Sequence, residues 1–173
     1  MSKPVKHHAG YSRKSTPEDV LEVAARLRPA DIAEIHARHP DMTPADALQF
    51  GFLTSAPCHT MVQTADDLPL GMWGIVPSRE SPDGYVWMLC TDELVSVPKN
   101  ARRFLVDVKR FLPLLLEVYP TLSNLIDSRN IVHLKFIEWL GFEIDTENVE
   151  VHNDVRFYPF HITMELYNER WSK

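Results

Sequence analysis

The sequence predicts a mixed α and β fold, in which helices and strands pack as layers. Three observations lead to this prediction. Apolar residues recur at helical spacing through the first third of the chain, and the period changes to that of strands in the middle third. The last third combines helical patterns with short strand patterns. The 173 residues, 45% of them hydrophobic and 24% charged, suit one packed domain, which we place at residues 16–173.

The first third of the chain is predicted to be helical after a polar start. We expect residues 1–15 to be a mobile N-terminus, in which residues 5–13 are the candidate first strand. Two helices then begin with the same signal, Thr16-Pro17 and Thr43-Pro44, each followed by an aspartate in the first turn. Threonine suits the N-cap and proline the first helical position. A shorter helix is expected between them at residues 31–39, ended by a proline.

The middle third predicts an antiparallel meander that leads into a long helix. The expected strands are residues 58–64, 70–76 and 85–91. Short polar turns join them at Asp66-Asp67 and before Gly84. The long helix is expected from Val97-Pro98 to Val118, with a kink at Pro113 because an interior proline costs about 3 kcal/mol.

The C-terminal third predicts a buried strand, a helix and a terminal hairpin. The strand is expected at residues 121–126, and the helix at residues 130–140, closed by Gly141 at its C-cap. Residues 149–155 and 157–166 form the expected hairpin, which turns at Asn153-Asp154.

The composition argues against several classes of function. Twenty-four Asp and Glu against eighteen Lys and Arg give a net charge of −6, which disfavours non-specific binding to nucleic acid or to an anionic membrane. The two cysteines, Cys58 and Cys90, form no CxxC pair and predict neither a disulfide framework nor a metal site. No apolar run approaches the roughly 20 residues of a membrane helix.

A nucleic-acid site is the least favoured function. Its cations would be Arg102, Arg103, Lys109 and Arg110.

Two stretches resemble the GNAT (GCN5-related N-acetyltransferase) superfamily. Residues 125–130, Leu-Ile-Asp-Ser-Arg-Asn, continue through His133 and Trp139 to Gly141-Phe142, which is similar to the strand, helix and terminal Gly-Phe of that superfamily. Residues 13–19 likewise resemble the end of its first strand and the start of its first helix. More narrowly, three segments resemble small GNAT-like proteins of tailed bacteriophages, some described as internal virion proteins. These segments are residues 85–92, 119–124 and 133–142.

The resemblance implies a mixed, mainly antiparallel sheet flanked by helices. Its strands at residues 85–92 and 122–126 would splay apart around a cleft for acyl-CoA. The implied activity is transfer of an acetyl or acyl group from acyl-CoA to an amine. The alternative is a catalytically inactive bacteriophage protein that binds a host or virion protein. The implied location is the host bacterial cytoplasm, with packaging in the virion as the alternative, and no membrane partner is expected.

Acyl transfer needs a base, a donor to the developing oxyanion and an acid for the leaving thiolate. Asp92 and Glu93, at the end of a strand, are the candidates for the base, and solvated carboxylates are the alternative. The oxyanion donor that the resemblance implies is a backbone N–H near Cys90, Thr91 or Asp92. His133 lies on the helix where the superfamily often has a tyrosine acid, and a packed, hydrogen-bonded histidine is the alternative. A nucleophilic thiol at Cys90 is less favoured than a small buried hydrophobe.

The resemblance implies that the phosphates of acyl-CoA lie at the start of the long helix, and a helix N-terminus suits anions. The superfamily has a glycine-containing loop there. Residues 95–103 of this chain, which has only six glycines and thirteen prolines, contain no glycine, and Pro98 removes an amide donor. Side chains would have to hold the phosphates instead. The predicted cofactor-binding residues are Lys99, Arg102, Arg103, Cys90, Thr91 and Asn130, the last of which also suits the N-cap of its helix.

Overall fold

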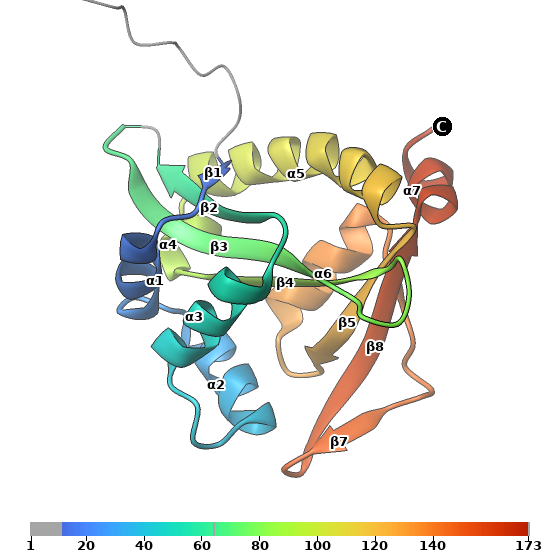
Figure 1. Cartoon of the computed structure of the whole chain (residues 1–173), viewed down its shortest axis with the longest axis horizontal. Helices are drawn as coiled ribbons and strands as arrows, with labels where there is room; N and C mark the ends of the chain where they lie inside the picture. Colours follow the sequence, from blue (N-terminus) through green and yellow to red (C-terminus); the bar gives the residue numbers. More distant parts are fainter. Residues whose placement is uncertain (1–11, 64, 173) are drawn as a thin grey trace, which may run out of the picture.

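A computed structural model describes residues 12–63 and 65–172, and its strands form one sheet (Figure 1). The helices are α1 (Pro17–Ala24), α2 (Pro29–Arg38), α3 (Pro44–Thr54), α4 (Asp92–Ser96), α5 (Pro98–Val118), α6 (Ile131–Leu140) and α7 (Met164–Trp171). The strands are β1 (Ser12–Lys14), β2 (Cys58–Gln63), β3 (Leu68–Pro77), β4 (Gly84–Cys90), β5 (Thr121–Asp127), β6 (Glu143–Ile144), β7 (Glu150–His152) and β8 (Val155–Thr163). The described end of the candidate first strand falls in β1, and the rest of that prediction lies outside the described residues.

The sheet is mainly antiparallel, and it opens in the middle. Its strand order is β1-β2-β3-β4-β5-β8-β6, with β7 paired to β8. The only parallel neighbours among the described strands are β4 and β5, which pair at Gly84 with Leu122 and at Tyr85 with Ser123. Beyond these two pairs the strands separate toward their C-terminal ends (Figure 1). The predicted splayed, mainly antiparallel sheet flanked by helices is therefore confirmed.

Helices cover both faces of the sheet with apolar side chains. On one face, Val20 of α1 and Leu48 of α3 are fully buried against Met72 of β3. On the other face, Phe104 of α5 packs with Cys90. Further along that face, α5, α6 and β8 share a core that contains Leu112, Leu116, Ile137, Leu140, Phe160 and Ile162.

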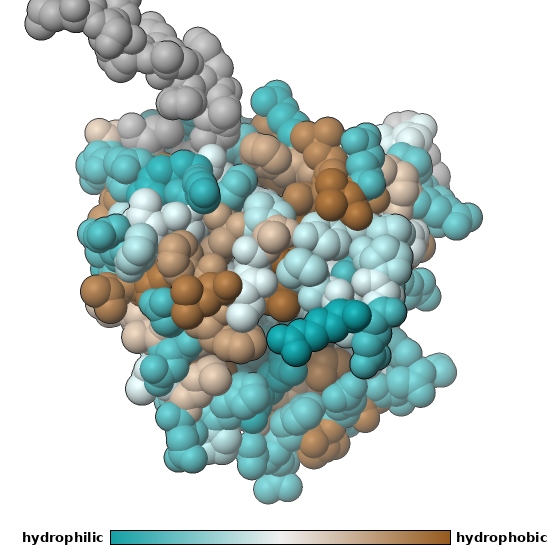
Figure 2. All heavy atoms as spheres, in the orientation of Figure 1, coloured by the Kyte–Doolittle hydropathy of each residue, from teal (hydrophilic) through white to brown (hydrophobic). Residues whose placement is uncertain are grey.

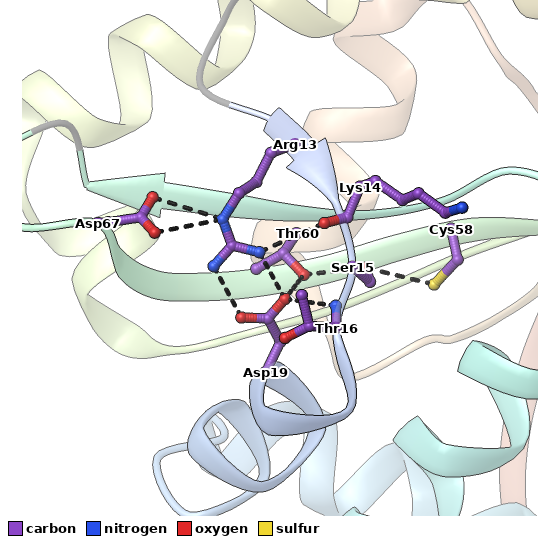
Figure 3. A network of polar contacts seen from close by, with 8 residues as sticks. All are labelled: Arg13, Lys14, Ser15, Thr16, Asp19, Cys58, Thr60 and Asp67. Atoms are coloured by element: carbon purple, nitrogen blue, oxygen red, sulfur yellow. Dashed lines mark hydrogen bonds and ion pairs between the residues drawn. The ribbon is translucent and has the colours of Figure 1, made fainter. Parts of the chain in front are cut away.

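The two Thr-Pro helix starts are confirmed, and a polar network fastens the first of them to the sheet. Thr16 and Thr43 are the N-caps of α1 and α3. Arg13 on β1 donates two hydrogen bonds to the Asp19 carboxylate, with nitrogen–oxygen distances of 2.7 and 2.9 Å (Figure 3). The same carboxylate accepts hydrogen bonds from the Thr16 backbone and the Thr60 hydroxyl. β1, α1 and β2 are thus held together at one carboxylate.

The long helix α5 continues through Pro113 and curves over the sheet (Figure 1). A proline at this position cannot donate to the carbonyl four residues earlier. The Tyr167 hydroxyl of α7 donates to that carbonyl, on Lys109, at 2.8 Å. The unexpected helix α7 therefore supplies the hydrogen bond that Pro113 removes.

The C-terminal hairpin is confirmed, but it ends earlier than expected. β7 and β8 turn at Asn153 and Asp154, both of which have positive φ. Residues 161–166 alternate like a strand, yet the chain leaves β8 at Thr163, whose hydroxyl accepts from the Leu166 backbone at the start of α7. Gly141, at φ 100°, closes α6 as predicted.

The surface is mostly polar on the side shown in Figure 2, with apolar atoms gathered over α5 and, at the left of the view, over α1 and α3. The exposed apolar side chains of these two helices are Leu21, Phe50 and Leu53.

Candidate functional site

A cavity of about 1420 Å³ passes through the sheet where β4 and β5 separate. Successive side chains of a strand point to opposite faces of its sheet, and β4 follows this rule. Trp87 packs in the core beneath α1 and α3, whereas Met88 packs with the core beneath α5. Both side chains line the cavity, together with Phe136 of α6 on the α5 side and Ile35 of α2 on the other. The gap between the strands thus joins the two faces of the molecule.

The backbone of β4 directs alternate hydrogen-bonding groups into this gap. The Thr91 N–H donates to the Leu70 carbonyl of β3, so the groups of Thr91 point away from β5. Because the direction alternates along a strand, the N–H and C=O of Val86, Met88 and Cys90 point toward the gap.

Two of these three residues already have partners. The Asn124 side chain of β5 donates to the Val86 carbonyl at 2.9 Å. The Cys90 N–H donates to the Asp31 carboxylate at 2.9 Å, and the Cys90 carbonyl accepts from the Arg28 N–H at 3.0 Å. The Met88 amide, between them, is therefore the β4 amide best placed to meet a bound carbonyl.

A buried polar cluster lets the start of α2 bridge the open end of the gap. Arg28, just before α2, donates from its guanidinium to the Asn130 side-chain oxygen at 3.2 Å and to the Cys90 sulfur at 3.6 Å. The Asn130 amide nitrogen donates to Asp31 at 3.2 Å. Arg28, Asp31 and Asn130 are at most 3% exposed. The cluster thus ties the end of β4 to the turn that follows β5.

Glu34 and His133 extend this cluster to the cavity, which both residues line. The Asn130 amide nitrogen lies 2.9 Å from the Glu34 carboxylate and 3.1 Å from Nδ1 of His133. Burial, reinforced by the nearby carboxylate of Asp31, raises the pKa of Glu34 to about 7. Burial lowers the pKa of His133, so its ring is neutral at pH 7.

Asp31, Cys90 and His133 offer potential metal-ligand atoms within 4.8 Å of one another. The Arg28 guanidinium, however, lies against the Cys90 sulfur. Burial raises the pKa of the Cys90 thiol to about 12, which keeps it protonated. A metal ligand must be a thiolate, and a second cation beside Arg28 would be repelled. The positive charge of this cluster is therefore supplied by Arg28.

A second pocket, of about 800 Å³, lies along the first turns of α5. Lys99, Arg102 and Arg103 line it, with Arg110 further along the helix. Asp107 lines both this pocket and the cavity. The cations at the start of α5 therefore lie beside the α5 mouth of the cavity.

The predicted site residues fall into three places. Lys99, Arg102 and Arg103 line the α5 pocket. His133 lines the cavity. Cys90, Thr91 and Asn130 are buried, and each is at most 2% exposed. Asn130 is the N-cap of α6 as predicted, but its side chain makes no cap hydrogen bond and joins the buried cluster instead.

Asp92 and Glu93 are not brought to the cavity. They form the first turn of the short helix α4, which the sequence did not predict, and neither is among the described residues that line the cavity. Glu93 is paired with Arg26 at 3.4 Å, and hydrogen bonding to its own backbone lowers its pKa. The structure thus places these two carboxylates on the outside of α4.

Arg28, Asp31 and Glu34 are the site residues that the sequence analysis missed. They stand three residues apart, a spacing that puts three side chains on one side of a helix start. Two acidic residues and one basic residue on the side that also carries the buried Ile35 are the signal that could have found them.

The comparisons with known proteins support the fold. No protein-family model matches the sequence, and no curated protein matches it. Among solved structures, the spermidine N-acetyltransferase from Vibrio cholerae in complex with CoA and spermine has a TM-score of 0.66 at 11% identity, covering 90% of this chain and 96% of that one. The GCN5-related N-acetyltransferase from Kribbella flavida has a TM-score of 0.62 at 17% identity, covering 88% and 96%. The GNAT-family acetyltransferase from Bacillus anthracis has a TM-score of 0.62 at 12% identity, covering 89% and 94%.

None of the described helices combines the length and the apolar character needed to cross a membrane. The order of the described elements, the parallel pairing of β4 with β5 and the cavity where these strands separate are features of a mixed, splayed sheet flanked by helices. Together with the solved structures, these features show that the chain has the fold of the GNAT acetyltransferases.

Proposed function

We propose that the protein transfers an acyl group from acyl-CoA to an amine. The observation that carries this proposal is the cavity through the sheet, which opens beside a cationic pocket on the α5 side and beneath α2 on the other. Two substrates can therefore approach one gap from opposite faces, as a direct transfer between them requires.

The α5 side suits the acyl donor. Lys99, Arg102 and Arg103 offer charge-assisted hydrogen bonds to phosphate groups, and the start of α5 adds the positive end of a 21-residue helix. Phe104 and Phe136 provide an apolar wall between that pocket and the gap. Acyl-CoA carries phosphates at one end and a thioester on a slender arm at the other, which matches this order of surfaces.

The gap itself suits the reacting carbonyl. The Met88 N–H points into it and would donate to the thioester oxygen as negative charge develops there. The amine nitrogen forms a bond to the carbonyl carbon, the carbon–sulfur bond breaks, and the thiol leaves toward the α5 side. Trp87 and Ile35 enclose the amine on the α2 side.

A binding-only role is the second candidate, and the start of α5 favours it. Pro98 occupies the first position of α5, and the exposed side chains of Val95 and Val97 replace the glycines of the superfamily loop. The phosphates would then lack most of their backbone donors, and the protein would act by contact with another protein. The narrower resemblance to bacteriophage proteins stays a prediction.

Calorimetric titration of acetyl-CoA into the protein separates the two candidates. We expect saturable binding that weakens at least about tenfold in the Arg102→Ala, Arg103→Ala double variant, because each lost charged hydrogen bond is worth about 1.5 to 3 kcal/mol. Arg79→Ala, which removes an exposed cation from the β3–β4 loop, is the matched control and should bind as the wild type does. No heat at high micromolar acetyl-CoA would reject the enzyme proposal.

A further inference from the structure

One carboxylate on α2 lies at the cavity and has no role yet in the proposed reaction. Glu34 is partly exposed and lines the cavity, and its Oε2 accepts from the Asn130 amide at 2.9 Å. We propose that Glu34 is the general base that takes a proton from the acceptor amine, a role that rests on the acyl transfer proposed above.

Hydrogen bonds around Asn130 show that Glu34 is held as an acceptor. Because the Arg28 guanidinium can only donate, its bond to the Asn130 oxygen fixes which end of the side chain is the amide nitrogen. That nitrogen carries two hydrogens, yet three acceptors lie within 3.2 Å of it. They are Asp31 Oδ1, Glu34 Oε2 and His133 Nδ1. Glu34 Oε2 is the nearest of the three and accepts one of these hydrogens. This hydrogen bond lowers the pKa of Glu34, but burial has the larger effect and raises it.

Two carboxylates near Glu34 favour proton uptake. Asp31 on the same helix and Asp127 at the end of β5 are carboxylates that repel a third negative charge. Arg129, after β5, is paired with Asp127 at 2.6 Å, and Arg28 is bonded to Asn130 and Cys90. Both cations are hydrogen-bonded to other groups, and Arg129 also attracts the Glu34 carboxylate at longer range.

His133 completes the surroundings of Glu34 from α6. Its Nδ1 faces the Asn130 amide, so Nδ1 is the acceptor and the ring proton lies on Nε2. Burial keeps the ring neutral at pH 7. Burial disfavours the charged form of Glu34 as well, and this raises its pKa to about 7, where a general base is most effective.

The acceptor ammonium loses two protons in the reaction, and each has a destination. An acceptor ammonium gives one proton to the Glu34 carboxylate, which becomes a carboxylic acid, and the amine nitrogen regains its lone pair. That lone pair attacks the thioester carbon, an amide bond forms, and the carbon–sulfur bond breaks. The second proton lost by nitrogen accompanies the departing thiolate, which leaves as a thiol.

The test compares pH–rate profiles of acetyl transfer to an amine for the wild type and Glu34→Gln. Glutamine keeps the size of the side chain and an oxygen that accepts from Asn130, but it cannot take a proton. We expect the rate at pH 7 to fall about 100-fold or more, with loss of the rise in rate near pH 7 that reports the base. Glu34→Asp should keep the rise in rate at a lower maximum. Glu138→Gln, on the exposed side of α6, is the matched control.

Acetyl-CoA titration separates the failure of this proposal from the failure of the proposed function. Glu34→Gln should bind acetyl-CoA as tightly as the wild type, which also shows that the variant is folded. If the variant binds but keeps the wild-type rate and pH profile, Glu34 is not the base, and acyl transfer stands. If the wild type itself neither binds acetyl-CoA nor transfers its acetyl group, both proposals are rejected.

Discussion

At the residue scale, the most unusual feature is an arginine that is 3% exposed. Arg28 is held by the Asn130 oxygen and the Cys90 sulfur, and its charge faces the buried carboxylate of Asp31. A buried charge without its partner is far costlier than one that is paired. The cluster therefore depends on Arg28 to keep α2, the end of β4 and the turn after β5 together.

Replacing Arg28 with methionine should destabilise the fold by about 3 to 5 kcal/mol, because the Asp31 carboxylate would stay buried without its cation. Equilibrium urea unfolding measures this loss. The double variant Arg28→Met, Asp31→Asn should lose less than the sum of the two single losses, since it leaves no lone charge. Additive losses would contradict the pairing, and exposed Arg79→Met should change stability by no more than about 0.5 kcal/mol.

At the scale of elements, the placement of α1 depends on the network around Asp19 (Figure 3). Burial alone would raise the pKa of Asp19, but hydrogen bonds from Arg13, Thr16 and Thr60 outweigh it and lower the pKa below its usual value. A carboxyl group with a lowered folded-state pKa stabilises the fold above its unfolded pKa of about 3.9 and loses that contribution as the pH falls through the folded value.

Asp19→Asn should therefore cost about 1 to 3 kcal/mol at pH 7, where the wild-type carboxylate carries the charged hydrogen bonds. The difference between variant and wild type should shrink as the pH falls below about 4, because protonation removes the same charge from the wild type. Urea unfolding midpoints at pH 7 and at pH 3 give both values. A stability difference that does not change with pH would show that the charge of Asp19 is unimportant.

At the scale of the whole molecule, the sequence predicts the layers better than it predicts the site. Periodicity and caps are local, and so α1, α3, the β7–β8 turn and the end of α6 at Gly141 follow the prediction. α7 does not, because residues 161–166 alternate like a strand and the pairing that ends β8 is a tertiary event.

The candidate site is only partly predictable for the same reason. Lys99, Arg102 and Arg103 are neighbours in the chain and gather as expected. Glu34 meets Asn130 only because α2 crosses the open end of the sheet, a contact between residues 96 positions apart. Asp92 and Glu93 were expected at a strand end, but they begin α4 on the outside of the molecule.

The central claim for the whole molecule is that two substrates meet in the gap between β4 and β5. Release of free thiol from acetyl-CoA, measured with and without a mixture of amines, tests this claim most directly. We predict release that requires both the protein and an amine, and that falls at least about tenfold in the Arg102→Ala, Arg103→Ala variant at sub-saturating acetyl-CoA. Acetyl-CoA binding without amine-dependent thiol release would contradict the account.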